Sequence, residues 1–346
     1  QMFIPVSNSD DLSTKPPQQK NSLPHRDYVS KGINGVLKEK KDDYEVVTNI
    51  DDNVGRIVSA VKNSGIEDNT IIIYLSDNGV FYGEHQMLHK GPTFYEEQIK
   101  TPFIFRYPKI SFADFKTSAL VSSMDIMPTL LDILKIPSPP DIQGKSFLSI
   151  LRGEAQQTRS SVFMEYYVQQ SSRVPMRGIV WNNWKWNHYR GSKGENRDYE
   201  LYNLADDPFE INNIMDKIGK DDDPLGRLLK DAHYGPVIQQ LRKEKAVWQS
   251  DSNDEFKISL SGTSTSSPSS GTLNISWTTD KDASSEIEYS EKDCSGCSPV
   301  KLDDFNFSKN HSVNITSLKS GVAYNIKIFS INPYGDGGYK ELIANL

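Results

Sequence analysis

The stretch from Thr70 to Pro102, TIIIYLSDNGVFYGEHQMLHKGPTFYEEQIKTP, decides the fold class of this chain. Residues 71–75 form an apolar run that a turn signal ends at once, which is typical of a strand buried on both faces of a parallel sheet. Ser76, Asp77, Asn78 and Gly79 follow the carboxyl end of that strand. Open α/β sheets bind their ligands at this position.

Two residues of this turn are candidate metal ligands. Asp77 and Asn78 offer a carboxylate and an amide oxygen side by side, and such oxygens suit a hard divalent cation such as calcium. Lys90 follows thirteen residues after Asp77, and its ammonium group is a candidate contact for an anion bound by the metal. Taken alone, however, Asp-Asn-Gly after a strand is typical of an ordinary turn.

The residues before the strand predict one α/β unit. Residues 1–40 are polar and lack periodicity, so we expect irregular surface chain there. From about Asp42 to Gly65, apolar residues recur at spacings of three and four, which predicts a helix. Gly65 lies where a left-handed residue ends a helix. Helix, short loop and buried strand together form an α/β unit.

The rest of the chain predicts four further parts. A helix begins near Asp125 and runs to about Lys135, and four short strands between 160 and 215 predict an antiparallel sheet. Residues 216–252 have a charged, helical composition. Serine, threonine and glycine dominate residues 259–271 and mark a boundary, after which alternating strands resume. We therefore expect domains at 1–157, 158–252 and 253–346.

The composition excludes some functions. The chain has 346 residues and a formal net charge of −7, which argues against general nucleic-acid binding because that requires a basic surface. No apolar run approaches the roughly 20 residues of a membrane span. The first residues, QMFIPVSNSDD, lack the pattern of a signal peptide. Cys294 and Cys297 form a CxxC that suits a redox pair, half of a metal site or a local disulfide, and its place between strands favours the disulfide.

The motifs of the opening stretch resemble the second half of the type I, formylglycine-dependent sulfatases. The resemblance rests on five matches in order, which are Ser76-Asp77-Asn78-Gly79, Gly83-Glu84-His85, Lys90, Tyr95-Glu96-Glu97 and Thr101-Pro102. Met124 to Leu131 and the closing segment ELYNLADDPFEINNI continue it, so it covers about residues 40–215. The fold that it implies is the C-terminal part of an alkaline-phosphatase-like α/β domain, followed by a small antiparallel α+β subdomain.

The C-terminal segment resembles a second family. Trp277 on an early strand and Tyr324 shortly after Leu-x-x-Gly resemble a fibronectin type III module, a β-sandwich in which Tyr324 is the corner tyrosine. These features describe packing and imply no catalysis. The module is a candidate for contact with a glycan or a surface.

The sulfatase resemblance implies a role for each matched residue. Asp77 and Asn78 become calcium ligands, and Lys90 becomes the catalytic lysine that contacts the sulfate. His85 is a candidate proton donor and His89 a candidate substrate contact, although each is equally compatible with a plain surface histidine. Glu96 and Glu97 are expected to hold the loop, because carboxylates repel a sulfate unless a metal intervenes.

The chain also departs from the family pattern. It contains no Cys-x-Pro-Ser-Arg motif, which supplies the formylglycine nucleophile, and no early aspartate pair. We therefore expect part of a sulfatase that is inactive alone and whose substrate is a sulfated carbohydrate. The alternatives are a phosphodiesterase or phosphonate hydrolase of the same superfamily, and a degenerate sulfatase that serves as a binding or surface module. The resemblance implies an extracellular or periplasmic location.

Overall fold

The computed structural model describes residues 4–91, 93–110, 115–167, 175–190, 197–218, 229, 231–252, 254 and 257–346. It divides into two compact units, 1–217 and 218–346. The helices and strands of the first unit, with α6 at its end, are η1 (Val6–Ser9), η2 (Leu12–Thr14), α1 (Pro17–Lys20), α2 (Leu23–Asn63), η3 (Glu67–Asn69), β1 (Ile72–Leu75), β2 (Phe81–Tyr82), η4 (Glu84–Gln86), β3 (Leu88–His89), α3 (Glu96–Ile99), β4 (Phe103–Arg106), η5 (Ser123–Asp125), α4 (Ile126–Ile133), α5 (Leu148–Leu151), β5 (Ser161–Tyr166), β6 (Met176–Trp181), β7 (Trp184–Arg190), β8 (Arg197–Asn203) and α6 (Ile214–Ile218).

The long helix α2 confirms one prediction and corrects another. It ends at Asn63, before Gly65 with φ +66°, as the sequence indicates. It begins at Leu23, however, where irregular chain was predicted. Ser22 caps the start by accepting a hydrogen bond from the His25 backbone N–H at 3.3 Å, and Pro24 lies in the first turn, where proline is compatible with a helix. Gly32, with φ 58°, interrupts the helix near its first third.

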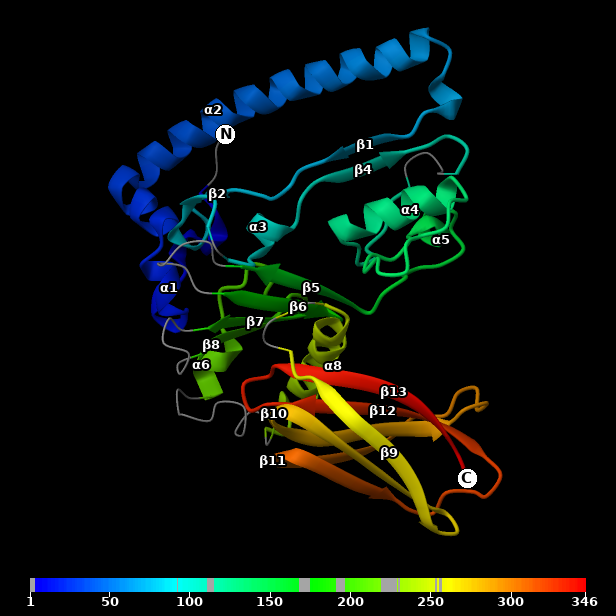
Figure 1. Ribbon diagram of the computed structural model, residues 1–346. Coiled ribbons are helices and arrows are strands. Elements are labelled where there is room, and N and C mark those ends of the chain that lie inside the picture. The colour runs from blue at the N-terminus through cyan, green and yellow to red at the C-terminus, as the bar shows by residue number, and fades with distance from the viewer. Residues whose placement is uncertain are drawn as a thin grey trace. The chain divides into compact units, whose positions relative to one another are not determined.

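Strand β1 differs from its prediction. Its residues are half-buried or exposed, and it pairs with β4 in an antiparallel two-stranded sheet. The prediction of a strand buried on both faces of a parallel sheet is therefore wrong for the described part of the chain. The reason lies in the packing of β4. Phe103 and Phe105 contact Phe147 on one face of the β1–β4 pair, whereas Ile104 on the opposite face is 61% exposed. Figure 1 shows the β1–β4 pair between α2 and the α4–α5 segment.

The antiparallel sheet predicted between 160 and 215 is confirmed. Strands β5, β6, β7 and β8 pair in sequence order, each antiparallel to the next. The predicted helix near Asp125 is also confirmed as α4. The Asp125 side chain accepts hydrogen bonds from the backbone N–H groups of Ser122 and Lys145 at 2.8 and 2.7 Å and pairs with buried Arg159. This motif residue therefore organises packing.

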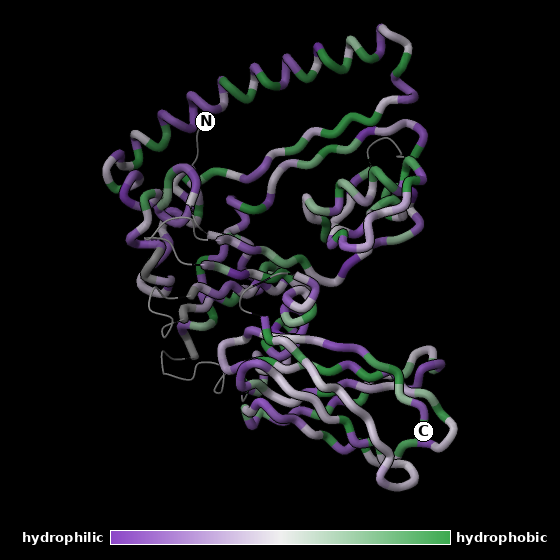
Figure 2. Tube along the Cα trace, in the orientation of Figure 1, coloured by the Kyte–Doolittle hydropathy of each residue, from purple (hydrophilic) through white to green (hydrophobic). Residues whose placement is uncertain are grey.

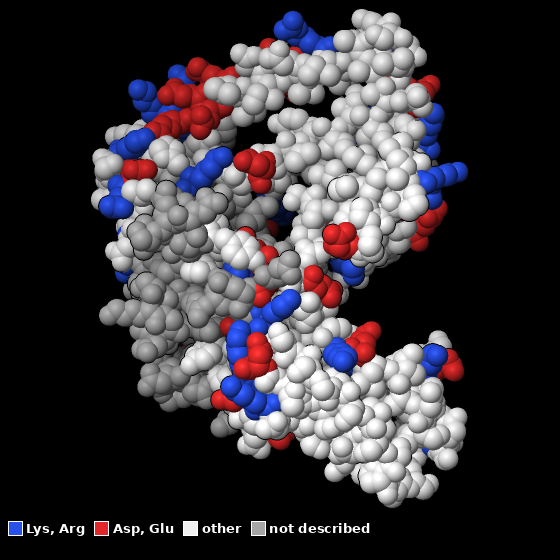
Figure 3. Space-filling model, in the orientation of Figure 1, with Lys and Arg blue, Asp and Glu red and all other residues white. Residues whose placement is uncertain are grey.

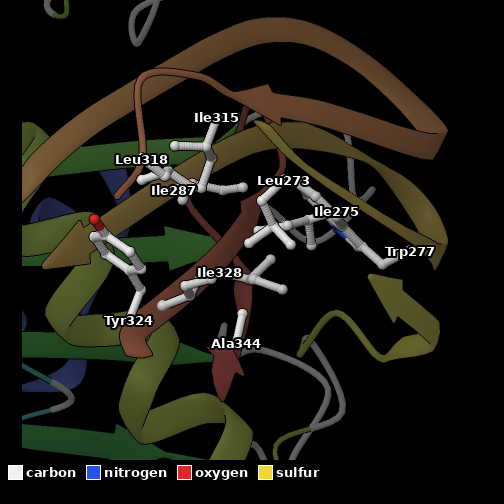
Figure 4. Packing of buried hydrophobic residues seen from close by; sticks show 10 residues of the cluster. Leu273, Ile275, Trp277, Ile287, Ile315, Leu318, Tyr324, Ile328 and Ala344 are labelled. Carbon is white, nitrogen blue, oxygen red and sulfur yellow. The ribbon is translucent and has the colours of Figure 1, made fainter. Parts of the chain in front are cut away.

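The second unit has its own helix, sheet and core. Its elements are α8 (Gly235–Asp251), β9 (Leu260–Ser269), β10 (Thr272–Glu291), β11 (Val300–Ile315), β12 (Ala323–Ile331) and β13 (Gly337–Asn345). The sheet order is β11-β10-β12-β13, with β9 on β10. Figure 4 shows apolar residues of these strands meeting in one cluster, including Trp277, Ile287 and Ile328. Cys294 and Cys297 form a disulfide, which confirms the predicted local bridge.

Helix α8 lies in this second unit. Ala246 packs against Phe329 and Ile331 of β12, and the Lys245 ammonium lies 3.1 Å from the Asp336 carboxylate. The predicted domain 158–252 combines α8 with strands β5 to β8, whereas the structure packs α8 on the sheet of the second unit. The charged composition of α8 does not indicate burial. Its lysines Lys243 and Lys245 are nevertheless buried, because each pairs with a buried acidic residue, Glu286 and Asp336.

Candidate functional site

The turn after β1 places one carboxylate near one ammonium group. The Asp77 Oδ1 atom accepts a hydrogen bond from the Asn78 backbone N–H at 2.8 Å, a contact between neighbours within the turn. The Asp77 Oδ2 atom lies 4.0 Å from the Lys90 Nζ atom, and the two side chains are 78% and 59% exposed. The structure thus brings together Asp77, Asn78 and Lys90 at the carboxyl end of β1.

A hairpin carries Lys90 back to the turn. Strands β2 and β3 pair antiparallel, and η4 joins them. Lys90 follows β3 directly. Gly83, at φ 98°, begins the connection, and a Cβ atom there would lie 2.9 Å from the side chain of Asn8. The hairpin therefore brings Lys90 close to Asp77, which lies thirteen residues earlier in the sequence.

Gln98 on α3 connects the two limbs of this loop. Its side-chain Oε1 atom accepts a hydrogen bond from the Gly91 N–H at 3.1 Å, and its Nε2 atom donates to the Gly79 carbonyl at 3.4 Å. The Gly79 N–H donates to the Gln98 main-chain carbonyl at 2.8 Å. A Cβ atom on Gly79 would lie 1.8 Å from the Glu97 carbonyl oxygen. Gln98 and Gly79 thus fix the distance between Asp77 and Lys90.

The structure places His85 in the interior, away from the exposed side chains of Asp77 and Lys90. Its ring is fully buried and stacks on Tyr95 with 3.7 Å between ring centroids. The Nδ1 atom lies 2.7 Å from Asp10 Oδ2, and the Nε2 atom lies 3.5 Å from Glu97 Oε2. A ring enclosed in this way does not face solvent, and proton donation by His85 stays a prediction. The residue instead ties the hairpin to the chain around Asp10.

Charge stabilises this buried arrangement. Burial by itself lowers the pKa of His85, but Asp10 and Glu97 outweigh burial and hold that pKa above its ordinary value. Burial also opposes ionisation of Glu97, but His85 outweighs it and lowers the pKa of that carboxyl. The Lys15 ammonium lies 3.3 Å from Asp10. The favoured state is therefore an imidazolium between two carboxylates, the pairing that a buried charge requires.

His89 remains on the surface. Its Nε2 atom lies 2.9 Å from Glu39 and its Nδ1 atom 3.5 Å from Asp27, both carboxylates of α2. The side chain is 48% exposed and precedes Lys90. The two acidic neighbours orient the ring, and its exposure is compatible with the predicted substrate contact.

Glu96 and Glu97 support the loop, in line with their expected role. Glu97 contacts His85, and Glu96 lies 2.7 Å from the buried Lys185 ammonium, which also pairs with Glu210 at 2.9 Å. Asp10, Lys15 and Gln98 belong to the same support, although the sequence pattern does not predict this. Asp10 lies 75 residues from His85 and Lys15 lies 187 residues from Tyr202, so no local spacing signals these two. Gln98 bonds within its own stretch, to Gly91 and Gly79.

Asp77 and Asn78 fit a divalent cation only in part. Asp77 offers an exposed carboxylate oxygen, and the Asn78 Nδ2 atom donates to the Gly79 carbonyl at 2.8 Å, which leaves its Oδ1 atom as a second donor. Calcium takes six to eight oxygen ligands. In the part of the chain that the structure describes, no group of three or more histidine, cysteine, aspartate or glutamate residues is arranged to hold a metal. These two residues are therefore compatible with one side of a cation site.

Two family models match the chain. The model described as Sulfatase matches residues 9–136, and the model described as N-sulphoglucosamine sulphohydrolase, C-terminal, matches residues 83–242. An N-acetylglucosamine-6-O-sulfatase of Bacteroides thetaiotaomicron is 35% identical over 182 residues, which are 51% of this chain and 32% of that protein. A sulfatase of Formosa agariphila is 32% identical over 191 residues, covering 49% of this chain and 33% of its own length.

Solved structures agree with these matches. A protein in complex with its substrate D-glucosamine-2-N,6-O-disulfate is 31% identical with a TM-score of 0.50, covering 59% of this chain and 39% of that one. Another solved structure, from Bacteroides thetaiotaomicron, has a TM-score of 0.63 at 24% identity, covers 74% of this chain and 53% of that one, and shows the shared fold.

The chain spans about a third of the length of the curated relatives named above. Among the described helices, none is long and apolar enough to cross a membrane. The two family models cover residues 9–242 between them, and both relatives are sulfatases. The chain is therefore similar to sulfatases within residues 9–242.

Proposed function

We propose that this chain forms one side of the active site of a sulfatase that hydrolyses a sulfate ester of a carbohydrate. The observation that carries the proposal is the juxtaposition of Asp77 and Lys90, 4.0 Å apart and exposed at the end of β1. The sulfatase relatives support the reaction class, and the N-acetylglucosamine-6-O-sulfatase supports a sulfated sugar as substrate.

Each site residue has a distinct task in this proposal. Asp77 and Asn78 would hold one divalent cation, with calcium as the candidate, and the cation supplies Lewis-acid stabilisation of the sulfate oxygens. Lys90 places a fixed positive charge near the same anion, where it stabilises negative charge as that charge develops. Exposed His89 lies beside Lys90 as a candidate contact for the sugar. Buried His85 and Gln98 hold the loop in shape.

The nucleophile must come from residues outside this sequence. Its two cysteines form a disulfide in the second unit, and the sequence has no Cys-x-Pro-Ser-Arg motif. The formylglycine of the proposed sulfatase is therefore not among these 346 residues, and the proposal assigns further cation ligands to another part of the complete enzyme. We infer that the chain is inactive by itself and that the complete enzyme acts outside the cytoplasm.

Residues 253–346 are proposed to be a fibronectin type III-like module that contacts a glycan or a surface. Trp277 is buried, and the Tyr324 hydroxyl accepts a hydrogen bond from the Lys319 backbone N–H at 3.0 Å. A hydroxyl bonded to the backbone a few residues upstream is the mark of a tyrosine corner. These contacts support the family of the module and assign it no catalytic residue.

The test compares two substrates and two proteins. The chain alone is expected to release no nitrophenol from 4-nitrophenyl sulfate in the presence of Ca²⁺. A longer protein that contains this chain together with a Cys-x-Pro-Ser-Arg motif is expected to hydrolyse the sulfate and to prefer it to 4-nitrophenyl phosphate. In that protein Lys90→Ala should lower kcat/KM about 100- to 1,000-fold, the range for removal of a stabilising group.

The control for that variant is Lys100→Ala, which removes an exposed lysine paired with Glu96 at 3.8 Å. It should leave kcat/KM nearly unchanged. A strong preference for the phosphate ester, or full activity of the Lys90→Ala protein, would contradict the proposal.

A further inference from the structure

Glu210 reaches across the first unit to the start of α3. It follows β8 in the closing segment of the sulfatase-like region, and its side chain is fully buried. The Glu210 Oε2 atom accepts a hydrogen bond from the Glu96 backbone N–H, 114 residues earlier, at 2.7 Å. The Glu210 backbone has φ 51°, a left-handed conformation that non-glycine residues keep only where their surroundings enforce it. The fold therefore holds Glu210 firmly against α3.

Lys185 of β7 joins the same contact from the antiparallel sheet. Its ammonium lies 2.7 Å from the Glu96 carboxylate and 2.9 Å from the Glu210 carboxylate, and it donates to the Phe94 carbonyl at 2.9 Å. These contacts match the three N–H donors of a lysine. Figure 2 shows hydrophilic as well as hydrophobic residues along β5–β8, and Lys185 is a hydrophilic residue of this sheet that is fully buried. We call Glu96, Lys185 and Glu210 the α3 clamp.

The burial of these charges is unusual. Charged side chains normally lie at the surface, as do those that gather over the earlier part of α2 in Figure 3, whereas Lys185 and Glu210 are fully buried. A buried ion pair contributes little net stability compared with apolar residues of similar volume. The effect of the α3 clamp is therefore expected in the position of α3 rather than in the stability of the whole unit.

Helix α3 carries this position to the exposed site. It has only four residues, too few for a helix that is stable by itself. The Gly79 N–H donates to the Gln98 main-chain carbonyl at 2.8 Å, and the Gly91 N–H donates to the Gln98 side chain at 3.1 Å. Gly79 lies two residues after Asp77, and Gly91 directly follows Lys90. A displacement of α3 would therefore move both limbs of the loop.

We propose that Lys185 and Glu210 are positioning residues, which hold α3 on the antiparallel sheet and thereby set the separation between Asp77 and Lys90. The closing segment of the sulfatase-like region thus acts on the site without touching it. This inference rests on the proposed function, because it names residues that position the proposed site.

Glu210 lies among groups of both signs. They are Lys185 and Tyr189 of β7, Glu96 of α3, Tyr202 of β8, and Lys15, which donates to the Glu210 main-chain carbonyl. Both tyrosine hydroxyls donate to the buried Glu200 carboxylate. Burial raises the pKa of Glu210 to about 7, although the Lys185 ammonium opposes this shift.

The α3 clamp should therefore respond to pH. Between about pH 4.5 and 7 the folded chain holds a proton on Glu210 that the unfolded chain has lost. The contribution of Glu210 to the free energy of unfolding is complete below about pH 4.5 and falls as the pH rises through about 7. Above that pH two carboxylates share one ammonium, so we expect the α3 clamp to loosen.

The first test uses the full chain and measures hydrogen exchange of the Gly79 and Gly91 amides at pH 6, each expressed as a protection factor. Glu210→Ala removes the acceptor for the Glu96 N–H and should lower both protection factors at least tenfold. Glu210→Gln keeps an acceptor and should restore them. The amide of Ile179 lies in a strand that is paired on both sides. Its protection should stay unchanged in both variants, which separates a movement of α3 from unfolding.

The second test changes the pH. From pH 6 to pH 8 both protection factors should fall about tenfold in the unchanged chain, which is the change that one group with a pKa of about 7 produces. Glu210→Gln should abolish this fall. The matched control is Glu165→Gln, which changes a carboxylate 3.2 Å from the buried Arg177 in the same sheet, and it should retain the fall.

Three results would overturn the inference. They are unchanged protection of Gly79 and Gly91 in Glu210→Ala, a loss that extends equally to Ile179, and a fall with pH that persists in Glu210→Gln. If the Glu210→Ala protein does not fold, the pH dependence of Glu210→Gln decides.

Activity separates this inference from the proposed function. In a longer protein that contains the chain and a Cys-x-Pro-Ser-Arg motif, Glu210→Ala should lower kcat for 4-nitrophenyl sulfate at least tenfold, and Glu210→Gln should retain most of it. An unchanged kcat in Glu210→Ala would also overturn the inference. If the longer protein hydrolyses no sulfate ester while the protection factors change as expected, the positioning role stands and the proposed function fails.

Discussion

At the scale of single residues, the exposed site depends on buried supports. Lys90 and Asp77 meet at the surface, but His85 and Gln98 beneath them determine that they meet. His85 holds the hairpin through two carboxylates, and Gln98 joins Gly79 to Gly91. His85 and Gln98 are buried, whereas the side chains of Asp77 and Lys90 remain exposed.

His85 should make the stability of the first unit depend on pH. Its pKa in the folded chain lies above the ordinary value of 6.5, so between these two values the folded state binds more protons than the unfolded state. The contribution of His85 to the free energy of unfolding should therefore be complete below about pH 6.5 and should fall as the pH rises through the pKa of the folded state. Urea unfolding of the chain over this pH range measures the effect.

The variant His85→Gln should remove that pH dependence and lower the stability at acidic pH. His89→Gln is the control, because it changes an exposed histidine of the same hairpin. A His85→Gln protein with the unchanged slope of stability against pH would refute the assignment. NMR titration of the His85 ring provides an independent measurement.

Gln98 should control the order of the limb that carries Lys90. Gln98→Leu removes the acceptor for the Gly91 N–H, and the exchange of that amide should become about fivefold faster, as expected for a net loss of about 1 kcal/mol. Gln98→Glu keeps an acceptor and should have a smaller effect. The Gly79 N–H bonds to the main-chain carbonyl of Gln98, so its exchange should remain slow in both variants and serves as the internal control.

At the scale of elements, α8 shows how buried charges fix a helix to a sheet. The Lys243 ammonium lies 3.2 Å from both Glu288 and Asp303 and 3.7 Å from Glu286. Burial opposes its charge, but the carboxylates outweigh burial and raise the pKa of Lys243. One cation thus neutralises acidic groups from β10 and β11, and it directs α8 to this sheet.

Lys243→Met should destabilise the second unit by about 3–5 kcal/mol, because it leaves buried carboxylates without their cation. Lys301→Met provides the matched control. Lys301 lies 3.4 Å from the same Glu288 but is 50% exposed, and such surface pairs contribute about 0–1 kcal/mol. Chemical denaturation monitored by tryptophan fluorescence would measure both. Equal losses of unfolding free energy in the two variants would contradict the expectation that the buried lysine contributes more than the exposed one.

At the scale of the whole molecule, the chain consists of two units that each have a core. Phe81, Met87, Tyr95 and Tyr202 form a buried cluster in the first unit, and Ile328 belongs to the cluster of the second. Because each unit has its own apolar centre, each should unfold as a cooperative element with its own transition.

Core substitutions should therefore act on one transition each. Phe81→Ala should lower the first unit's stability by about 3–5 kcal/mol, and Ile328→Ala the second unit's by about 2–5 kcal/mol. Differential scanning calorimetry of the full chain should show two transitions, with one moved in each variant. A single transition that shifts equally in both proteins would contradict the division into independent units.

The sequence by itself determined the local elements and the residues of the exposed site. Helical spacing and Gly65 predicted the end of α2, alternation predicted the antiparallel strands between 160 and 215, and the turn after residue 75 identified Asp77, Asn78 and Lys90. These features depend on near neighbours, so local pattern is sufficient to find them.

Only the tertiary structure decided the rest. It buried His85 beside Asp10, 75 residues away, placed α8 on the following sheet and left β1 with one partner strand and an uncovered face. Each outcome depends on partners distant in the sequence, and a chain's local pattern records neither which distant side chain neutralises a buried charge nor which surface covers an apolar strand. The physical reason is that burial and ion pairing are properties of the assembled neighbourhood and are absent from any short stretch of sequence.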